Sequence, residues 1–173
     1  MNEGHEKINA GEQEISPEKE RLLALEREGR FVFHGSAAKI EKLEPRQPEI
    51  FNIEEQKRET HGEPCVSATP LAEVAIFRAI INKQNFPSGE YASSFSFDVD
   101  RDKAIFKASK EVLEKLESEE YRGYVYVLNK KDFLKFSGME WRSGKEMIPS
   151  EIIEVSLRDL PKKIRVVDWI KDK

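Results

Sequence analysis

Residues 31–36, with the sequence Phe-Val-Phe-His-Gly-Ser, constrain the fold of this chain more than any other stretch. Aromatic and β-branched side chains pack well on a pleated surface, so the run from Phe31 to Phe33 predicts a buried strand. Gly35 lacks a Cβ atom and lets the backbone turn sharply or lie close against a ligand. Taken alone, the pattern is more typical of a core strand that ends in a turn than of a ligand site. It nevertheless places His34 where a polar ligand could be oriented.

The composition indicates one globular domain. A chain of 173 residues is long enough to bury a real core, and we expect residues 1–15 to be a disordered tail and residues 16–173 to form the domain. The net charge of −4 gives no electrostatic reason to expect a nucleic acid or a membrane surface as partner. The chain starts without the basic and apolar segments of a signal peptide, and no apolar run approaches membrane-spanning length. The sequence therefore predicts a monomeric, cytoplasmic protein.

The cysteine and histidine content argues against two other kinds of site. Cys65 is the single cysteine, which excludes an internal disulfide and fits a reducing compartment. With three histidines and no second cysteine, we expect no zinc or other metal site. No basic residue adjoins Cys65, so we interpret it as a small core residue and not as a nucleophile.

Local signals predict four helical segments. Ser16 is a good N-cap and Pro17 suits a first helical turn, while Gly29 is typical of a helix end. Thr69 followed by Pro70 predicts the start of another helix for the same reasons. The other two segments are residues 37–43 and residues 109–120.

Apolar clusters and alternating patterns predict many short strands. Residues 46–63 are mostly charged and lack a clear period, so we expect a long exposed loop in which His61 is solvated. Strands outnumber helices, which predicts an α+β domain with two packed, mainly antiparallel sheets and flanking helices. The strands expected after residue 36 are 65–66, 93–99, 103–107, 123–128, 140–143, 146–148, 152–157 and 164–167.

Two segments resemble motifs of one known family. The stretch from Phe33 to Ser36 resembles the His-Gly-Ser/Thr signature of the ADP-ribosyltransferase fold, in its diphtheria-toxin and poly(ADP-ribose) polymerase branch. Residues 66–77 are similar to the second motif of that branch, a short strand followed by a helix that carries Ser-Ala-x-Tyr. Ala68 and Ala75 match the alanines of that motif, and Phe77 stands where the family has the tyrosine. The resemblance covers roughly residues 31–157.

The third motif of the family is a late strand that bears a glutamate, and two segments resemble it. Residues 140–143, Glu-Trp-Arg-Ser, resemble the Glu-Tyr-x-x of the polymerases. Residues 145–149, Lys-Glu-Met-Ile-Pro, look more like the Glu-Val-Leu-Ile-Pro of arginine-modifying transferases. That second alignment places the catalytic glutamate on Lys145 unless the register slips by one residue. Glu140 is therefore the preferred catalytic glutamate, and Glu146 is the alternative.

The resemblance implies that NAD is the substrate and that residues of the motifs bind it. The backbone of Gly35 would bind the nicotinamide amide, His34 would bind the ribose, and Ser36 completes the motif. An aromatic ring at Phe77 would stack on nicotinamide, since loss of a hydroxyl leaves the stacking face intact. The glutamate would polarise a ribose hydroxyl and stabilise the oxocarbenium-like centre as nicotinamide leaves.

Ser67 and Thr69 have two interpretations. Both could touch NAD, but roles at the strand–helix corner and at the N-cap explain them better. For the whole protein, we expect an NAD-dependent mono-ADP-ribosyltransferase, a glycosyltransferase that releases nicotinamide and modifies an unknown acceptor. A non-catalytic module that binds NAD or ADP-ribose is the first alternative. An RNA 2′-phosphotransferase-like enzyme is the second, and the acidic balance of the chain argues mildly against it.

Overall fold

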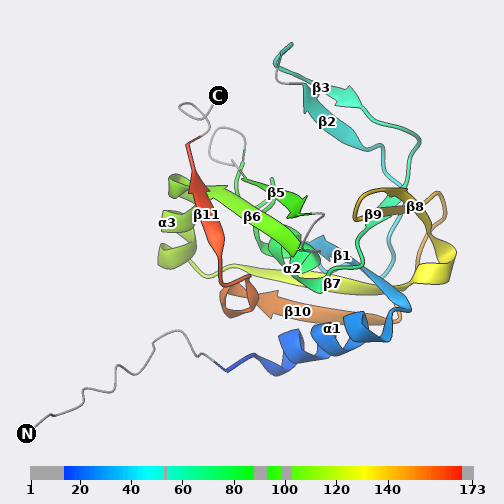
Figure 1. Cartoon of the computed structure of the whole chain (residues 1–173). Helices are drawn as coiled ribbons and strands as arrows, with labels where there is room; N and C mark the ends of the chain where they lie inside the picture. The colour runs from blue at the N-terminus through cyan, green and yellow to red at the C-terminus, as the bar shows by residue number, and fades with distance from the viewer. Residues whose placement is uncertain (1–13, 53, 88–92, 99–102, 169–173) are drawn as a thin grey trace, which may run out of the picture.

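A computed structural model describes residues 14–52, 54–87, 93–98 and 103–168, and these residues form an α+β fold (Figure 1). Most of the expected N-terminal tail lies outside the described residues. The helices are α1 (Pro17–Glu28), α2 (Ala72–Ile80) and α3 (Lys110–Ser118), with short 3₁₀ turns η1 (Lys130–Asp132) and η2 (Leu157–Asp159). The strands are β1 (Phe31–Ser36), β2 (Glu49–Asn52), β3 (Lys57–Thr60), β4 (Val66–Ala68), β5 (Ser93–Asp98), β6 (Lys103–Ser109), β7 (Arg122–Asn129), β8 (Leu134–Ser137), β9 (Glu140–Ser143), β10 (Glu151–Ser156) and β11 (Ile164–Val167).

The central sheet has the strand order β1-β7-β10, and both of its pairings are antiparallel. Two glycines let α2 lie directly on the backbone of this sheet. A Cβ atom at Gly35 of β1 would lie 2.0 Å from the carbonyl oxygen of Ala75, and one at Gly123 of β7 would lie 2.3 Å from that of Ala79. Because no side chain fits in either gap, α2 is held at a fixed height over the sheet.

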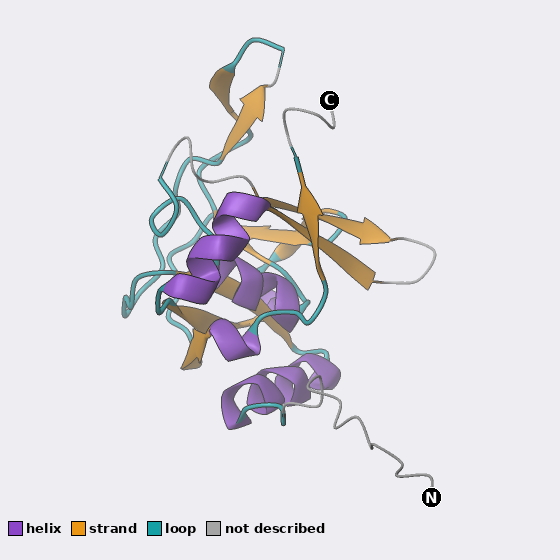
Figure 2. Ribbon diagram, turned by 90° about the vertical axis from the view of Figure 1, so that its left-hand side faces the viewer, coloured by secondary structure: helices purple, strands orange, loops and turns teal. Residues whose placement is uncertain are grey.

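Two further sheets and one hairpin complete the arrangement. β5 and β6 form an antiparallel pair, and β11 adds to β6 in parallel. The other sheet has the order β4-β9-β8 and is antiparallel throughout. It is joined to the central sheet by a bridge in which Phe33 and Thr69 exchange backbone hydrogen bonds of 2.7 and 2.9 Å. The β2–β3 hairpin projects from the body in both views (Figure 1 and Figure 2).

The central sheet is buried on both faces. Phe33, Val125 and Val127 pack on the face that α2 covers, whereas Val32 and Tyr126 pack in a second cluster on the opposite face. This division follows from the two-residue period of side chains along a strand. Full burial of each large apolar side chain contributes about 1.5–3 kcal/mol to stability, so the two clusters hold the sheet in place.

Many sequence-based expectations are confirmed. Ser16 caps α1 by accepting from the backbone N–H of Lys19, and Gly29 ends it with a left-handed φ of 71°. The α+β class is confirmed, as is the buried strand that begins at Phe31, and the strands expected from residues 93 and 103 onward are present as β5 and β6. The expected number of sheets is wrong, because the described residues form three three-stranded sheets and a separate hairpin, not two sheets. No helix within the described residues is long and apolar enough to cross a membrane.

Two expected helical features are wrong, because the backbone N–H and carbonyl groups concerned form hydrogen bonds with distant parts of the chain. Residues 37–43 form no helix, since the Tyr126 hydroxyl accepts from the N–H of Ile40 and donates to the carbonyl of Ala38. Thr69 is not an N-cap, because its backbone pairs with β1 and α2 begins only at Ala72. The carboxylate of Glu26 on α1 accepts from the N–H of Ala72 at 2.9 Å and so takes the place of a local cap.

Two expected strand assignments also fail. Residues 46–63 are not one irregular loop, because they contain β2 and β3. Residues 146–148 form no strand, and only Met147 pairs there, in a single bridge with Leu43. The strands at Phe31 and Val66 belong to different sheets and are linked through the Phe33–Thr69 bridge.

Candidate functional site

A cavity of about 580 Å³ lies where β1, β4, α2 and the β8–β9 hairpin meet. This volume is within the range of small-molecule sites, about 300–1,000 Å³. Three of the residues singled out by the sequence motifs, His34, Ser67 and Glu140, line the cavity together. The full lining is Phe33, His34, Gly35, His61, Ser67, Ala68, Thr69, Val74, Ala75, Arg78, Asn82, Phe95, Phe136, Ser137, Met139 and Glu140.

Ser67 connects the other two motif residues. Nδ1 of His34 lies 2.7 Å from the carbonyl oxygen of Ser67. The hydroxyl of Ser67 donates to Oε1 of Glu140 at 2.9 Å. Ser67 is the middle residue of β4, which pairs with β9 on one side and is bridged to β1 just beyond Ala68. The backbone and side chain of one residue therefore orient a histidine on β1 and a glutamate on β9.

His34 is neutral, and its tautomer follows from its partner. Burial lowers the pKa of His34; the bond to Ser67 opposes this shift, and the charge of Arg46 adds to it. A carbonyl oxygen can only accept a hydrogen bond, so Nδ1 carries the single ring proton. Nε2 is then an unprotonated acceptor on a residue that lines the cavity.

Glu140 is held by one of its two carboxylate oxygens. Oε1 accepts from the Ser67 hydroxyl and also from Nε of Arg142, each at 2.9 Å. Within the part of the chain that the structure describes, Oε2 has no hydrogen-bond partner, and the side chain is 34% exposed. Glu140 therefore offers a second, oriented acceptor to whatever occupies the cavity.

Arg142, His61 and Phe136 form a cluster beside Glu140. The guanidinium of Arg142 donates to the carbonyl oxygen of His61 at 3.0 Å and approaches its Nδ1 at 3.3 Å. It also lies 3.6 Å from the centre of the Phe136 ring, and this ring meets that of His61 edge to face at 5.5 Å. The expectation that His61 is solvated is therefore wrong, because these contacts draw it to the cavity.

Helix α2 supplies one wall of the cavity through Val74, Ala75 and Arg78, which lie at helical spacing, and Asn82 joins the lining just beyond the end of the helix. The guanidinium of Arg78 lies 4.8 Å from the centre of the Phe95 ring, so a cation and an aromatic face occur together there. The side chain of Asn82 bonds to four backbone groups at the end of α2 and serves to close the helix: the carbonyls of Arg78 and Ala79 and the amides of Gln84 and Asn85.

Phe77 does not lie with His34 and Glu140, in contrast to the expectation that its ring stacks on a ligand there. Phe77 is fully buried in the core and is not part of the cavity lining. Its ring centre lies 5.1 Å from that of Phe106. α2 turns other residues toward the cavity, and Phe77 projects to the inner side of the helix, where burial of a large apolar ring is favourable. Phe95 and Phe136 are the aromatic rings that line the cavity instead.

Gly35 and Thr69 line the cavity but also have structural roles. Gly35 is needed for the close approach of α2, as described above. The hydroxyl of Thr69 accepts from the N–H of Leu71 at 3.3 Å. Ser36 lies outside the cavity lining, and its hydroxyl accepts from the N–H of Ala38 at 3.3 Å.

Glu146 is separated from the other motif residues. It is absent from the cavity lining and forms an ion pair with Lys42. Both side chains are about half exposed. Of the two glutamates that the sequence left open, Glu140 is the one that lies with His34.

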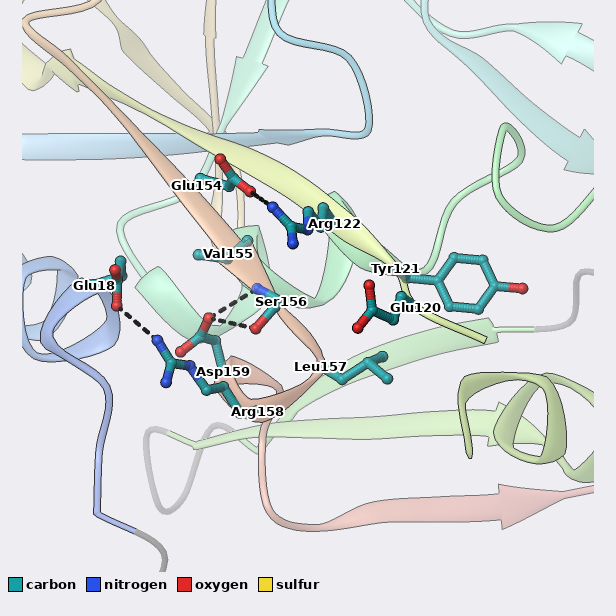
Figure 3. A pocket seen from close by; sticks show the side chains of 10 residues that line it. All are labelled: Glu18, Glu120, Tyr121, Arg122, Glu154, Val155, Ser156, Leu157, Arg158 and Asp159. Carbon is teal, nitrogen blue, oxygen red and sulfur yellow. Dashed lines mark hydrogen bonds and ion pairs between the residues drawn. The ribbon is translucent and has the colours of Figure 1, made fainter. Parts of the chain in front are cut away.

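A second cavity, of about 500 Å³, lies between α1, the start of β7 and the end of β10 (Figure 3). Four of its charged side chains form two ion pairs: Arg122 with Glu154 at 2.9 Å, and Arg158 with Glu18 at 3.3 Å. Asp159, 2% exposed, accepts from the backbone N–H of Ser156 and from the hydroxyl of the N-cap Ser16. The contacts of Asp159 with Ser16 and of Arg158 with Glu18 tie the start of α1 to η2, and we interpret this region as structural.

The described residues hold no group of three or more histidine, cysteine, aspartate and glutamate side chains that could bind a metal ion. Burial raises the pKa of Cys65, so its thiol is a poor nucleophile. Comparison with protein-family models, with curated proteins and with solved structures finds no match for this chain.

Proposed function

We propose that this protein binds NAD in the cavity of His34 and Glu140 and transfers its ADP-ribose group to an acceptor. The observation that carries the proposal is the pair of oriented acceptors, Nε2 of His34 and Oε2 of Glu140, both anchored through Ser67. A ligand that satisfies them must supply hydrogen-bond donors. The vicinal hydroxyls of a ribose are two such donors on adjacent carbons.

The other cavity residues are compatible with the rest of NAD. Phe95 and Phe136 offer apolar ring faces to flat heterocycles such as nicotinamide. Arg78 is a cationic residue of the same lining, and a guanidinium suits phosphate oxygens well. The resemblance of residues 33–36 to the family motif supports the same ligand.

The transfer reaction breaks the bond between C1′ of the ribose and the nicotinamide nitrogen. The electron pair of this bond leaves with nicotinamide, which becomes neutral, and the positive charge passes to the ribose as an oxocarbenium-like centre. Glu140 stabilises this charge and polarises the ribose hydroxyl that it binds. The acceptor then forms the new bond to C1′ and gives up one proton. With water as acceptor, the products are ADP-ribose, nicotinamide and a proton.

The test combines NAD binding by calorimetry with release of nicotinamide measured by chromatography. Glu140→Gln should lose about 10²–10³-fold in kcat, the range for loss of one electrostatic stabiliser, and should still bind NAD. Glu146→Gln is the matched control and should keep nearly full turnover. Equal turnover in both variants would remove Glu140 from the mechanism.

The same measurements separate the alternatives. A non-catalytic module would bind NAD and release no nicotinamide in the wild type. A 2′-phosphotransferase-like enzyme would consume NAD only when an RNA with a 2′-phosphate is added. Absence of NAD binding to the intact chain would refute the proposal altogether.

A further inference from the structure

Arg142 joins three parts of the candidate site that are distant in sequence. Its Nε donates to Glu140 on the same strand, and its Nη1 donates to the carbonyl oxygen of His61, beyond the end of β3. Its guanidinium plane also lies against the ring of Phe136 on β8. The side chain is only 11% exposed. Because a guanidinium holds its donors in a rigid fork, these contacts fix one another's geometry.

All three nitrogens of this guanidinium are already engaged within the protein. Nε bonds to Glu140, Nη1 to the His61 carbonyl, and Nη2 faces Nδ1 of His61 at 3.3 Å. A guanidinium has no acceptor, so Nδ1 of His61 must accept in that contact. Arg142 is also absent from the cavity lining. These facts argue against Arg142 as a direct ligand of the substrate.

The geometry points to Arg142 as a positioning residue that acts through Glu140. Together with Ser67 it holds Oε1, which leaves Oε2 as the oxygen presented to the ribose. Without Arg142 the carboxylate would keep one anchor and could rotate about its last side-chain bond. This inference rests on the proposed function, since it assigns the second anchor of the proposed catalytic group.

The chain contains a matched arginine–glutamate pair for comparison. Arg122 and Glu154 also approach to 2.9 Å, but the Arg122 side chain is 66% exposed and is absent from the cavity lining. An exposed pair of this kind contributes little to stability. Arg122→Gln therefore removes the same charge at a position where no effect on NAD turnover is expected.

The experiment measures kcat, the Kd for NAD and the urea unfolding midpoint of Arg142→Gln, Arg142→Lys and Arg122→Gln. Arg142→Gln should lower kcat by about 10- to 100-fold, the range for one charge-assisted hydrogen bond, with the Kd for NAD changed less than about threefold. Arg142→Lys keeps the charge without the fork and should fall between wild type and Arg142→Gln. A variant that merely lost stability would regain wild-type kcat at a temperature where it is fully folded.

A double-mutant cycle decides whether Arg142 acts through Glu140. In a Glu140→Gln background, Arg142→Gln should cause little further loss of kcat, because the group that it positions is already disabled. If Arg142→Gln lowers kcat by the same factor in the Glu140→Gln background as in the wild type, the inference is wrong. It is also wrong if Arg142→Gln weakens NAD affinity and leaves kcat unchanged.

Nuclear magnetic resonance of the Arg142 Nε–H group separates this inference from the proposed function. In the wild type the signal should exchange slowly with water, and Glu140→Gln should shift it and speed its exchange. A fast-exchanging wild-type signal would refute the pairing itself. A protected signal in a protein that never cleaves NAD would instead refute the proposed function and, with it, the catalytic purpose of the pairing.

Discussion

The position of α2 over the central sheet depends on Gly35, and Gly35→Ala tests this directly. The added Cβ would lie 2.0 Å from the carbonyl oxygen of Ala75 and 2.7 Å from the amide nitrogen of Ala79. Cβ atoms do not occur within 3.0 Å of such atoms, so β1 and α2 must separate by about 1 Å. Both obstacles are backbone atoms, which no side-chain rotation can remove. Overpacking of this kind costs about 1–3 kcal/mol.

Urea unfolding followed by circular dichroism measures this cost. With a denaturant slope of about 2 kcal/mol per molar, a loss of about 2 kcal/mol lowers the midpoint by about 1 M. Gly144→Ala is the matched control, because a Cβ there meets nothing within 4 Å and φ lies outside the left-handed region. Its midpoint should stay equal to that of wild type or rise slightly. If Gly35→Ala and Gly144→Ala unfold at the same urea concentration, the close approach of α2 is refuted.

Three further predictions follow from the contacts of the site and of α2. Ser67→Ala removes the hydroxyl that bonds to Glu140 and should lower NAD turnover by about 10- to 100-fold with a smaller change in NAD affinity, as measured by nicotinamide release and calorimetry. Burial lowers the pKa of His34 from 6.5, so just below that pH the unfolded chain binds more protons than the folded chain. The free energy of unfolding should therefore fall as the pH drops below 6.5. His34→Gln should flatten this dependence in urea titrations at several pH values, and an unchanged slope would contradict it. Glu26→Ala removes the acceptor for the first amide of α2 and should cost about 0.5–2 kcal/mol by urea unfolding, whereas Glu20→Ala on the exposed side of α1 should cost less than Glu26→Ala.

The parts of the fold that local chemistry determines were predictable from the sequence. Ser16 and Gly29 act within one turn of α1, and their roles need no knowledge of the rest of the chain. The start of α2 was not predictable, because its first amide bonds to Glu26, which is 46 positions away. The missing helix at residues 37–43 has the same kind of cause, since Tyr126 lies 86 positions from Ile40.

The candidate site shows the same division. His34 and Glu140 were singled out by sequence motifs, and the structure brings them to one cavity, where Ser67, for which a corner role was preferred, lies between them. His61 and Arg142 were missed, because their contact joins residues 81 positions apart and no local pattern marks it. The location of Phe77 was not predictable for a related reason. Helical periodicity shows which residues share one face of α2, but not whether that face packs in the core or lines a cavity. The packing of Phe77 against Phe106 shows that its face belongs to the core.

The double role of Ser67 has a mechanical consequence. β4 is three residues long, and its central residue orients His34 with its carbonyl and Glu140 with its hydroxyl. A displacement of β4 would therefore move one anchor of each group at the same time. Substitutions that displace β4 as a whole should thus change the orientation of His34 and Glu140 together, in contrast to Arg142→Gln, which removes an anchor of Glu140 alone.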